Sequence, residues 1–462
     1  MKRPTLTLIA TALLCAIALP ASHAGQPGSS TAAIAAKVPN LGRQVLAAGD
    51  GWASMPTAAL PQGTTGGSAA APTRVHRVRT RDELVAALAF PDTTPKIIEI
   101  EGTVDANVDA ANQPLACADY HRNDPQTGTP YSLEAFLREY DPATWGRVNP
   151  SGPLERARAA SASAQQARVR IRIPANTTLV GVGHDARVLG AWFDVRPSST
   201  SGNTPTNVII RNLAFEDTYD CFPQWAPNDG STGNWNSLYD VISIRNATHV
   251  WVDHNSFADV ATTNDSLPVY FGRLYEVHDG LLDVTNEADL VTISWNRFSH
   301  HDKVMLVGSS DGAVVDRGKL RLTLHHNLFE DMGQRVPRVR YGQVHLYSNH
   351  YKISDEAAST YGYSWGAGIE SQIYAEQNHF RVSDAITPDL FIERYNGTRL
   401  FATGTLLNGV SPRNAVDVVA AFNAVNGDTL VNGVEWTPPF HGPITPASKV
   451  PVAVTRGAGP FR

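Results

Sequence analysis

Hydrophobic and polar residues alternate strictly over residues 168–173. Val169, Ile171 and Ile173 alternate with arginines at 168, 170 and 172. A period of two buries one face of a β-strand and exposes the other. The pattern therefore predicts that the chain consists mostly of β-strands from this point on.

A short phrase recurs within this part of the chain: a β-rich run, an asparagine, one further residue, and then an aromatic or other bulky apolar group. Its six asparagines are Asn212, Asn255, Asn296, Asn327, Asn349 and Asn378, so that successive copies lie 43, 41, 31, 22 and 29 positions apart. The shortest gap approximates one turn of a solenoid, and the longer gaps would hold inserted loops.

The repeated asparagine predicts two structural features. Because asparagine tolerates left-handed backbone better than most residues, we expect one at a tight bend in each coil. Stacked coils would also bring the asparagines into register, where their amides can bond along the axis. The expected fold is an all-β, right-handed parallel β-helix with a short N-terminal capping helix and long inserted loops. A β-propeller, the structural alternative, would show longer and more even repeats.

Three regular elements are expected before the repeats. Thr80 and Glu83 have the spacing of a capping box, and the apolar run 84–90 behind them predicts a short helix. Residues 96–104 have the composition of a strand. Residues 153–167 predict a second helix, begun by Ser151 and with proline in its first turn.

The N-terminus has the order of a secretory signal peptide: Lys2 and Arg3, an apolar run over 6–19, and small residues before Ala24. We expect cleavage after Ala24. The apolar run is shorter than the roughly 20 residues of a membrane span, so no anchor is expected. Residues 25–462 would then form a single β-helix catalytic domain. Its first part, to about residue 71, is predicted to be an irregular surface arm or a solvated leader.

Composition and charge restrict the class of partner. The chain is 42% hydrophobic and 18% charged, with a net charge of -6, which argues against nucleic-acid or membrane-surface binding. An acidic substrate would need a local basic site or a bridging cation. In the exported chain only Cys117 and Cys221 remain, either as a disulfide or as two buried thiols.

Three segments carry a resemblance to a known family. They are Tyr239-Asp240-Val241-Ile242-Ser243-Ile244 with Val250-Trp251-Val252-Asp253-His254, His278-Asp279-Gly280-Leu281-Leu282-Asp283 with His300-His301-Asp302-Lys303, and Gln334-Arg335-Val336-Pro337-Arg338-Val339-Arg340-Tyr341-Gly342. In this order and spacing they resemble polysaccharide lyase family 1, the pectate lyases, of the extracellular bacillar type. The likeness covers nearly the whole exported chain.

The resemblance implies a secreted, monomeric, calcium-dependent enzyme that cleaves polygalacturonate by β-elimination. It implies Asp240, Asp279 and Asp283 as Ca²⁺ ligands and Arg335 as the group that abstracts the C5 proton. It further implies that Lys303 and Arg340 bind substrate carboxylates. The chemistry is coherent, because a hard dication on the uronate carboxylate stabilises the enolate that forms when C5 loses its proton.

The residues themselves support this assignment in part. Asp279 and Asp283, four positions apart on a strand, would face the same side, and Asp240 could join them from a preceding coil. Some family members carry a further acid where this chain has Leu238, so a fourth protein ligand is not expected. A guanidinium is ordinarily protonated, but neighbouring positive charge would disfavour the charged form of Arg335.

Other polar and aromatic residues of the repeats receive structural interpretations. We expect Asp253-His254 and His325-His326 to form structural hydrogen bonds, and Trp251 and Trp295 to pack rather than to bind sugar.

Three competing functions share this fold. A pectin lyase would cleave methyl-esterified substrate without Ca²⁺, and the presence of the three aspartates argues against this function. A polygalacturonase would hydrolyse with paired carboxylates. A non-catalytic polysaccharide-binding β-helix gives no reason for an arginine beside an acidic cluster.

Overall fold

The computed structural model describes residues 40–197, 206–427 and 429–461. The predicted signal peptide, residues 1–24, and the first part of the predicted arm lie outside the described residues. From Asn40 onward the chain forms one unit. None of the helices in the described part of the chain has the length and apolar character that a membrane crossing requires.

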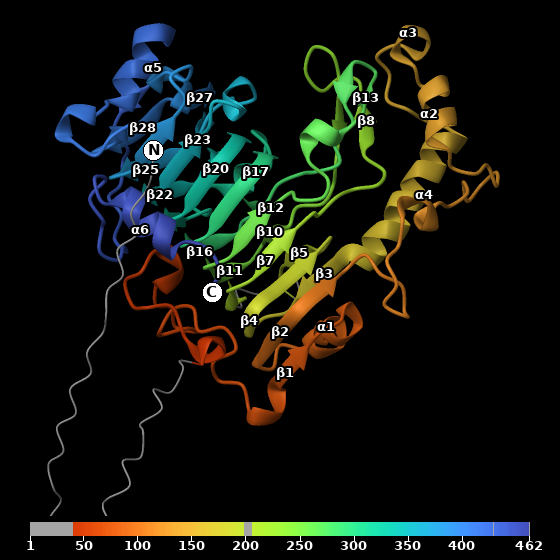
Figure 1. Cartoon of the computed structure of the whole chain (residues 1–462), viewed down its shortest axis with the longest axis horizontal. Helices are drawn as coiled ribbons and strands as arrows, with labels where there is room; N and C mark the ends of the chain where they lie inside the picture. The colour runs from red at the N-terminus through yellow and green to blue at the C-terminus, as the bar shows by residue number, and fades with distance from the viewer. Residues whose placement is uncertain (1–39, 198–205, 428, 462) are drawn as a thin grey trace, which may run out of the picture. The chain divides into compact units, whose positions relative to one another are not determined.

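Parallel strands stack in three rows along one axis, which we call rows A, B and C (Figure 1). Row A contains β1 (Val75–Val78), β2 (Lys96–Asp105), β4 (Thr177–Leu189), β6 (Val208–Arg211), β11 (Thr248–Asp253), β16 (Asp289–Ser294), β19 (Leu322–His325), β22 (Gln343–Tyr347), β25 (Gln372–Glu376), β28 (Arg399–Thr403) and β30 (Val431–Asn432).

Row B begins with the second halves of the long strands β2 and β4. It continues through β7 (Ala214–Glu216), β12 (Ser256–Ala258), β17 (Arg297–Lys303), β20 (Leu328–Gln334), β23 (His350–Ile353), β26 (His379–Val382) and β29 (Leu406–Leu407). Row C is a separate sheet of β3 (Arg170–Ile173), β5 (Trp192–Val195), β10 (Ile242–Arg245), β15 (Leu282–Thr285), β18 (Leu306–Val307), β21 (Arg338–Val339), β24 (Trp365–Gly368) and β27 (Ile392–Tyr395). One strand from each row makes a coil, which confirms the parallel β-helix.

The interior of the solenoid is apolar and contains a continuous aromatic stack. Neighbouring rings in this stack have centroids 4.3 to 5.1 Å apart and planes within 20° of parallel. Its members, one from each successive row B strand, are Phe215, Phe257, Phe298, Phe329, Tyr351 and Phe380. All are buried, so each coil adds one large apolar group to a core that runs the length of the axis.

Five of the six repeat asparagines form a ladder between rows A and B. In each successive pair, Nδ2 of one asparagine donates to Oδ1 of the next. The distances are 3.0 Å for Asn255–Asn296, 3.1 Å for Asn296–Asn327, 3.0 Å for Asn327–Asn349 and 3.2 Å for Asn349–Asn378. All five side chains are fully buried. The predicted register of amides along the axis is confirmed for these five coils.

The predicted left-handed conformation of the asparagines is wrong for the same five coils. Positive φ falls instead on the residue before each ladder asparagine: His254, Trp295, His326, Ser348 and Gln377, at 50 to 55°. Asn212 is the exception. The pairing of Arg211 with Asp253 places Asn212 opposite His254, one position out of the ladder, and its φ is 57°. The bend only needs a residue that tolerates this conformation, whereas the ladder needs an amide that both donates and accepts.

Replacing Asn327 by alanine is expected to lower the free energy of unfolding by roughly 2–4 kcal/mol. Its Oδ1 accepts from the backbone N–H and the amide of Asn296, and its Nδ2 donates to the Ile293 carbonyl and to Asn349. The alanine variant leaves these partners buried and unpaired. Thermal unfolding measures the effect, and Asn228→Ala, an exposed asparagine, is the matched control. Equal midpoints for the two variants would contradict a stabilising ladder.

The elements expected before the repeats are present. Helix α1 (Arg81–Leu88) begins with the capping box, in which Thr80 accepts from the Glu83 N–H and Glu83 accepts from the Thr80 N–H. Helix α4 (Pro153–Val169) has Gly152, not Ser151, as its N-cap. The φ of Gly152 is 105°, which favours glycine over serine at that position.

Long insertions form a separate wall beside the strands. They contain α2 (Leu133–Glu139), α3 (Pro142–Trp145), α4 and two antiparallel pairs, β8 (Gln224–Ala226) with β9 (Asn234–Asn236) and β13 (Val269–Tyr270) with β14 (Arg273–Leu274). Figure 1 shows these elements standing to one side of rows B and C. Their own core includes Phe136, Trp225, Trp235 and Tyr275, so the wall is a folded unit and not a set of independent loops.

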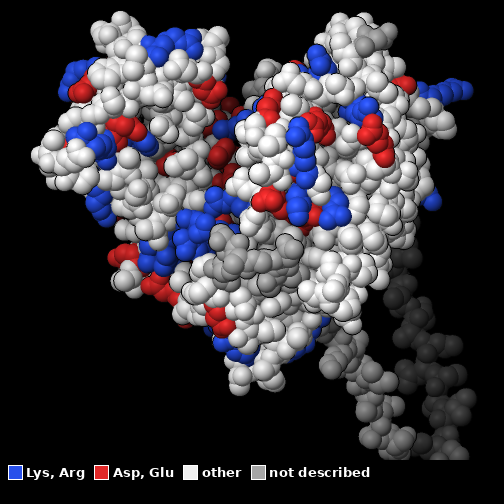
Figure 2. Space-filling view, turned by 180° about the vertical axis from the view of Figure 1, so that it is seen from behind, with Lys and Arg blue, Asp and Glu red and all other residues white. Residues whose placement is uncertain are grey.

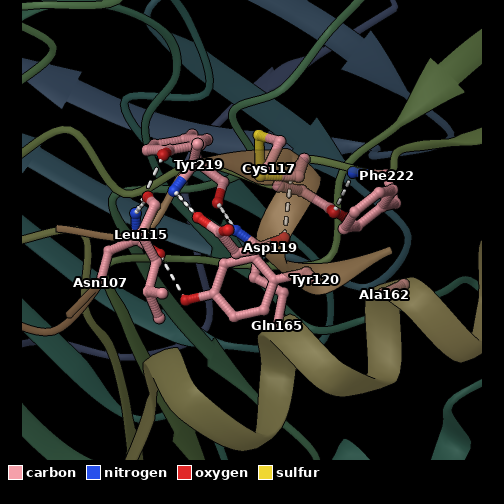
Figure 3. The surroundings of a disulfide bond; sticks show 12 residues. Asn107, Leu115, Cys117, Asp119, Tyr120, Ala162, Gln165, Tyr219 and Phe222 are labelled. Atoms are coloured by element: carbon pink, nitrogen blue, oxygen red, sulfur yellow. Dashed lines mark hydrogen bonds between the residues drawn. A yellow bond between two sulfur atoms is a disulfide. The ribbon is translucent and has the colours of Figure 1, made fainter. Parts of the chain in front are cut away.

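Cys117 and Cys221 form a disulfide across this wall, which resolves the alternative left open by the sequence. The bond lies beside α4 (Figure 3). Gln165 of α4 accepts from the Cys221 N–H and donates to the Tyr219 carbonyl. The disulfide thus ties the start of the insertions to the segment that leads into row C.

Removing the disulfide, as Cys117→Ser with Cys221→Ser, is expected to lower the free energy of unfolding. The two cysteines are 104 positions apart, and closing a loop of about 100 residues contributes at most roughly 4–5 kcal/mol through the entropy of the unfolded chain. Thermal unfolding with and without reductant measures the change. Reductant should lower the unfolding midpoint of the native chain and leave that of the double variant unchanged. If neither the reductant nor the double substitution lowered the unfolding midpoint, the disulfide would not stabilise the protein.

Two terminal segments cover the outer face of row A. The Trp52 and Ala53 N–H groups donate to Thr323 and Thr292, each at 3.0 Å. From the C-terminal segment, the Gly442 N–H donates to the Tyr347 hydroxyl at 3.1 Å. The N-terminal segment therefore forms an irregular arm on the sheet, as predicted, from residue 40 onward. Helix α6 (Val450–Gly457) follows, with Val450 and Val454 packed on Leu328, and α5 (Val418–Asn426) lies further along the axis.

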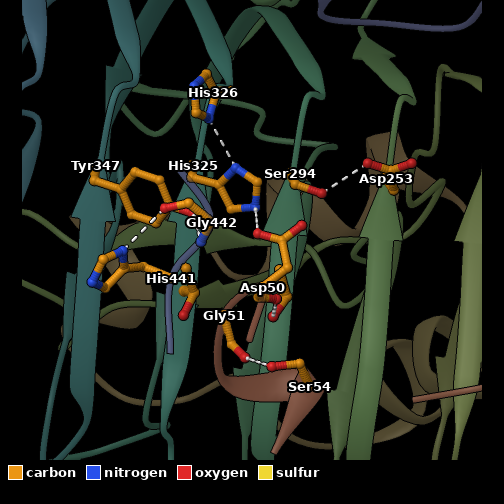
Figure 4. A network of polar contacts seen from close by, with 12 residues as sticks. Asp50, Gly51, Ser54, Asp253, Ser294, His325, His326, Tyr347, His441 and Gly442 are labelled. Carbon is orange, nitrogen blue, oxygen red and sulfur yellow. Dashed lines mark hydrogen bonds and ion pairs between the residues drawn. The ribbon is translucent and has the colours of Figure 1, made fainter. Parts of the chain in front are cut away.

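A buried polar network lies under these segments (Figure 4). His325 and His326 contact each other at 2.9 Å through their Nδ1 atoms, and Asp50 lies 3.4 Å from His325 Nε2. In the same layer, Asp253 accepts from Ser294 and from Arg211 at 2.8 Å each. These contacts confirm the structural interpretation of both histidine-containing pairs.

The two histidines predict that the protein loses stability in acid. Burial lowers the pKa of His325 and of His326 to about 3, whereas an unfolded histidine takes up its proton near pH 6.5. The stabilisation is therefore complete above pH 6.5 and is lost as the pH falls toward 3, by about 1.4 kcal/mol per pH unit for each histidine. His326→Gln should reduce this slope, because glutamine does not take up a proton in this range. Glutamine also suits the left-handed backbone at this position, since Gln377 occupies the equivalent position in a later coil. Unfolding free energies at pH 7, 6, 5 and 4 measure both slopes, and identical slopes would exclude His326 as a contributor.

Candidate active site

The six candidate residues lie where row B passes into row C, facing the wall. Figure 2 shows a cleft between two lobes that has both acidic and basic side chains in it. Lys303 ends β17, Arg335 follows β20, and Arg340 follows β21. Asp283 lies in β15 and Asp240 lies two residues before β10, while Asp279 is in the segment that enters β15. Strands of consecutive coils therefore bring together residues that lie far apart in the sequence, such as Asp283 and Arg335.

Asp240 and Asp283 converge beside Gly280. Asp240 Oδ1 accepts from the Gly280 N–H at 3.1 Å, and its other oxygen accepts from the Ser243 hydroxyl. Asp283 Oδ1 accepts from the Leu306 N–H at 2.9 Å. A Cβ at position 280 would lie 2.5 Å from Asp283 Oδ1 and 3.0 Å from Asp240 Oδ1. Only glycine leaves this space between the two carboxylates open.

The acidic residues carry more negative charge than the surrounding protein neutralises. Burial, and then the charges of Asp283 and Asp279, raise the pKa of Asp240 well above its ordinary value. Burial and Asp279 raise the pKa of Asp283 to about 7, although Arg335 and Lys303 act in the opposite direction. Like charges crowded in a buried place disfavour ionisation, and a cation in this space would reverse the effect.

Asp279 lies beside Lys303. Its Oδ1 lies 3.7 Å from Lys303 Nζ. Its backbone carbonyl contacts His301 Nε2 at 2.7 Å, and His301 Nδ1 lies 2.7 Å from Asp259 Oδ2. Both nitrogens of His301 meet acceptors, so the ring is a cation. Burial alone would lower the pKa of His301, but the ion pair with Asp259 outweighs it and raises that pKa to about 9.

The donor set is oxygen-only, which suits a hard cation. However, across residues 40–197, 206–427 and 429–461 no three His, Cys, Asp or Glu side chains are already gathered as a metal site. Asp240 and Asp283 fit such an ion as they stand, around the space that Gly280 leaves open. Asp279 would have to turn from Lys303 to complete the set.

Arg335 is held by its backbone, and its side chain forms no ion pair within the described residues. Its φ is 60°, and its carbonyl accepts from the Met305 N–H at 2.9 Å in the preceding coil. Its Nε is buried and has no hydrogen-bond partner within the described chain. The positive charge of Arg335 nevertheless reaches Asp283, since it lowers the pKa of that carboxyl. The structure thus places an unpaired guanidinium beside the acidic residues.

Arg340 is engaged by the protein itself. Its Nε donates to Asp311 Oδ1 at 2.6 Å and its Nη1 donates to the Gly308 carbonyl at 2.9 Å. The intervening Arg338 stacks on Tyr395, with the guanidinium carbon 3.7 Å from the ring centroid. Both side chains are largely removed from water. Asp311 lies in a loop that the sequence does not connect to Arg340.

Several neighbours of the site were not identified from the sequence. Ser243 and Gly280 lie within the resembling segments but carry no signal beyond their position. His301 lies beside Lys303 in sequence, and its partner Asp259 is 42 positions away. These residues orient the candidate ligands through hydrogen bonds, and such partners become visible only when coils are stacked.

Comparison with known proteins gives a consistent result. A family model described as pectate lyase matches residues 151–427. The chain is 44% identical over 426 residues to the pectate lyase of Bacillus subtilis (strain 168), covering 92% of this chain and 94% of that protein. It is 33% identical over 374 residues to pectate lyase E of Dickeya dadantii, covering 79% and 77%.

Solved structures of similar proteins agree with these matches. A mutant of the Bacillus subtilis pectate lyase superposes with a TM-score of 0.83 at 44% identity, over 91% of this chain and 99% of that one. A pectate lyase bound to a hexasaccharide gives the same values.

Proposed function

We propose that this chain, which belongs to the pectate lyase family, cleaves α-1,4-polygalacturonate by calcium-assisted β-elimination to 4,5-unsaturated oligogalacturonides. The observation that carries the proposal is the placement of Arg335, whose Nε has no hydrogen-bond partner within the described residues, beside the buried Asp240 and the half-buried Asp283. We further propose that the enzyme is secreted and acts as a monomer.

Asp240, Asp279 and Asp283 would hold Ca²⁺. When bound there, the ion neutralises the uronate carboxylate and stabilises the negative charge that develops next to it. The raised pKa values of Asp240 and Asp283 support this assignment, because two buried carboxylates without a cation repel each other. Gly280 supports it by leaving the space between them free.

Arg335 acts in its neutral form as the base that takes the proton from C5 of the sugar. The electron pair left at C5 forms the double bond to C4, the C4–O4 bond breaks, and O4 leaves as a hydroxyl of the neighbouring sugar once protonated. No carboxylate in the described residues pairs with Arg335, so no ion pair holds its proton in place.

Lys303 and Arg340 bind substrate carboxylates in this proposal. Lys303 lies 3.7 Å from Asp279 and would be free for that task if Asp279 bound the ion. Arg340 retains N–H groups beyond those that Asp311 and Gly308 occupy, so it can add a uronate to its present partners.

The absorbance of the product tests the function. Elimination from polygalacturonate yields a 4,5-unsaturated uronide that absorbs in the ultraviolet, and hydrolysis yields none. Chain shortening without absorbance would indicate a polygalacturonase, and a preference for fully methyl-esterified pectin in chelator would indicate a pectin lyase. Binding with no shortening would leave a non-catalytic polysaccharide-binding protein.

A further inference from the structure

Four arginines surround one buried carboxylate at the N-terminal end of row C. Asp194 of β5 has no exposed surface and contacts Arg170 Nε at 2.8 Å, Arg245 Nη2 at 2.7 Å and Arg196 Nε at 3.2 Å. Arg172 of β3 is paired in register with Asp194 and is exposed. We call Arg170, Arg172, Arg196 and Arg245 the arginine cluster.

The arginine cluster carries more charge than its structure requires. One carboxylate balances one guanidinium, and Arg170 with Arg245 already satisfies both oxygens of Asp194. Arg196 shares Asp194 Oδ2 with Arg170, and Arg172 stacks on Phe90, so four guanidiniums gather near a single carboxylate. Burial first, and then the neighbouring arginines, lower the pKa of Arg196, although Asp194 acts in the opposite direction. A local positive surplus in a chain of net charge -6 favours the binding of an anion.

The cluster remains accessible to a ligand. The side chains of Arg170, Arg245 and Arg196 are 17%, 29% and 34% exposed. Arg170 and Arg172, with Arg81 and Phe90, also line a hollow of about 440 Å³ between α1, α4 and β3. Figure 2 shows that Lys and Arg side chains gather at one end of the cleft.

The arginine cluster is aligned with the candidate active site. Along row C, Asp283 pairs with Ser243, Ser243 with Asp194, and Asp194 with Arg172. Neighbouring strands are about 4.8 Å apart, which places Asp194 about 10 Å and Arg172 about 15 Å from Asp283 along the axis. Trp192, over which Arg170 and Arg245 stack, donates to Ser243, which in turn donates to Asp240.

We infer that the arginine cluster is a distal subsite that binds uronate carboxylates of the same polygalacturonate chain, several sugars from the bond that is cleaved. This inference rests on the proposed function. A polymer lying along row C over the acidic residues continues directly onto the cluster. Each guanidinium presents paired N–H donors that match a carboxylate, and a repeating anion suits a row of them better than a single small ion does.

The distal position predicts an effect that depends on substrate length. Arg172→Gln combined with Arg196→Gln removes two charges and leaves Asp194 paired with Arg170 and Arg245. We expect kcat/KM on polygalacturonate to fall about tenfold through KM, while kcat/KM on trigalacturonate stays within about twofold. Arg413→Gln with Arg456→Gln, two exposed arginines, is the control with the same change in charge and should leave both substrates unaffected.

Two results would overturn the distal subsite: an equal loss on the polymer and the trimer, or no loss on either. Binding of polygalacturonate in chelator, measured by titration calorimetry on the native chain and the double variant, separates this inference from the proposed function. If the native chain binds the polymer in chelator but forms no unsaturated product once Ca²⁺ is added in excess, the lyase assignment fails. The weaker binding expected of the double variant can still be observed in that case.

Discussion

Replacing Arg335 with lysine is expected to lower kcat on polygalacturonate at least about a hundredfold, with little change in KM. Lysine retains a positive charge but ends in a single flexible amine, whereas the guanidinium presents its nitrogens in a rigid plane. The left-handed backbone of Arg335 and its bond to Met305 fix the direction in which that plane points. Initial rates of ultraviolet-absorbing product measure the loss.

The matched control for Arg335→Lys is Arg381→Lys, the same substitution at an exposed arginine of β26 in row B. It should leave kcat unchanged. Both variants should unfold at the midpoint of the native chain, because Arg335 makes no side-chain ion pair in the described structure. A kcat close to native for Arg335→Lys would remove Arg335 from the role of base, whatever the control shows.

The fold could be predicted from the sequence because each coil repeats a local pattern. The alternation around Ile171 and the recurring asparagine both follow from one strand or one bend, and their period reveals the stacking. The failure at Asn212 has the same origin. Its phrase resembles the others, but the pairing of Arg211 with Asp253 shifts it by one residue, and single-sequence patterns do not fix register.

The candidate site was predictable only as a list of residues. The order of the segments indicated Asp240, Asp283 and Arg335, and the structure brings them together. The pairing of Arg340 with Asp311 could not be predicted, because it joins a strand end to an inserted loop whose path no periodicity records. The packing of the wall could not be predicted for the same reason. Helix α2 packs there through Phe136 into a core that contains Trp235.

A chelator is expected to abolish lyase activity on polygalacturonate, and excess Ca²⁺ is expected to restore it. The physical reason lies in the acidic residues: the buried Asp240 and the half-buried Asp283 repel each other, and a divalent cation would turn that repulsion into attraction. Ca²⁺ should therefore also raise the unfolding midpoint of the protein, which is a readout independent of turnover. Full activity in chelator would exclude a metal from the reaction.

Asp283→Asn separates metal binding from folding. The asparagine retains an oxygen that accepts from the Leu306 N–H, and it removes one of the repelling charges. In chelator the variant should unfold at or above the midpoint of the native chain, whereas its activity and its stabilisation by Ca²⁺ should both be lost. The matched control is Asp302→Asn, the same substitution at a carboxylate outside the proposed ligand set, which accepts a hydrogen bond from Gln334. This control should retain the rise in the unfolding midpoint with Ca²⁺. If Asp283→Asn were destabilised in chelator yet responded normally to Ca²⁺, Asp283 would be a structural residue and not a ligand.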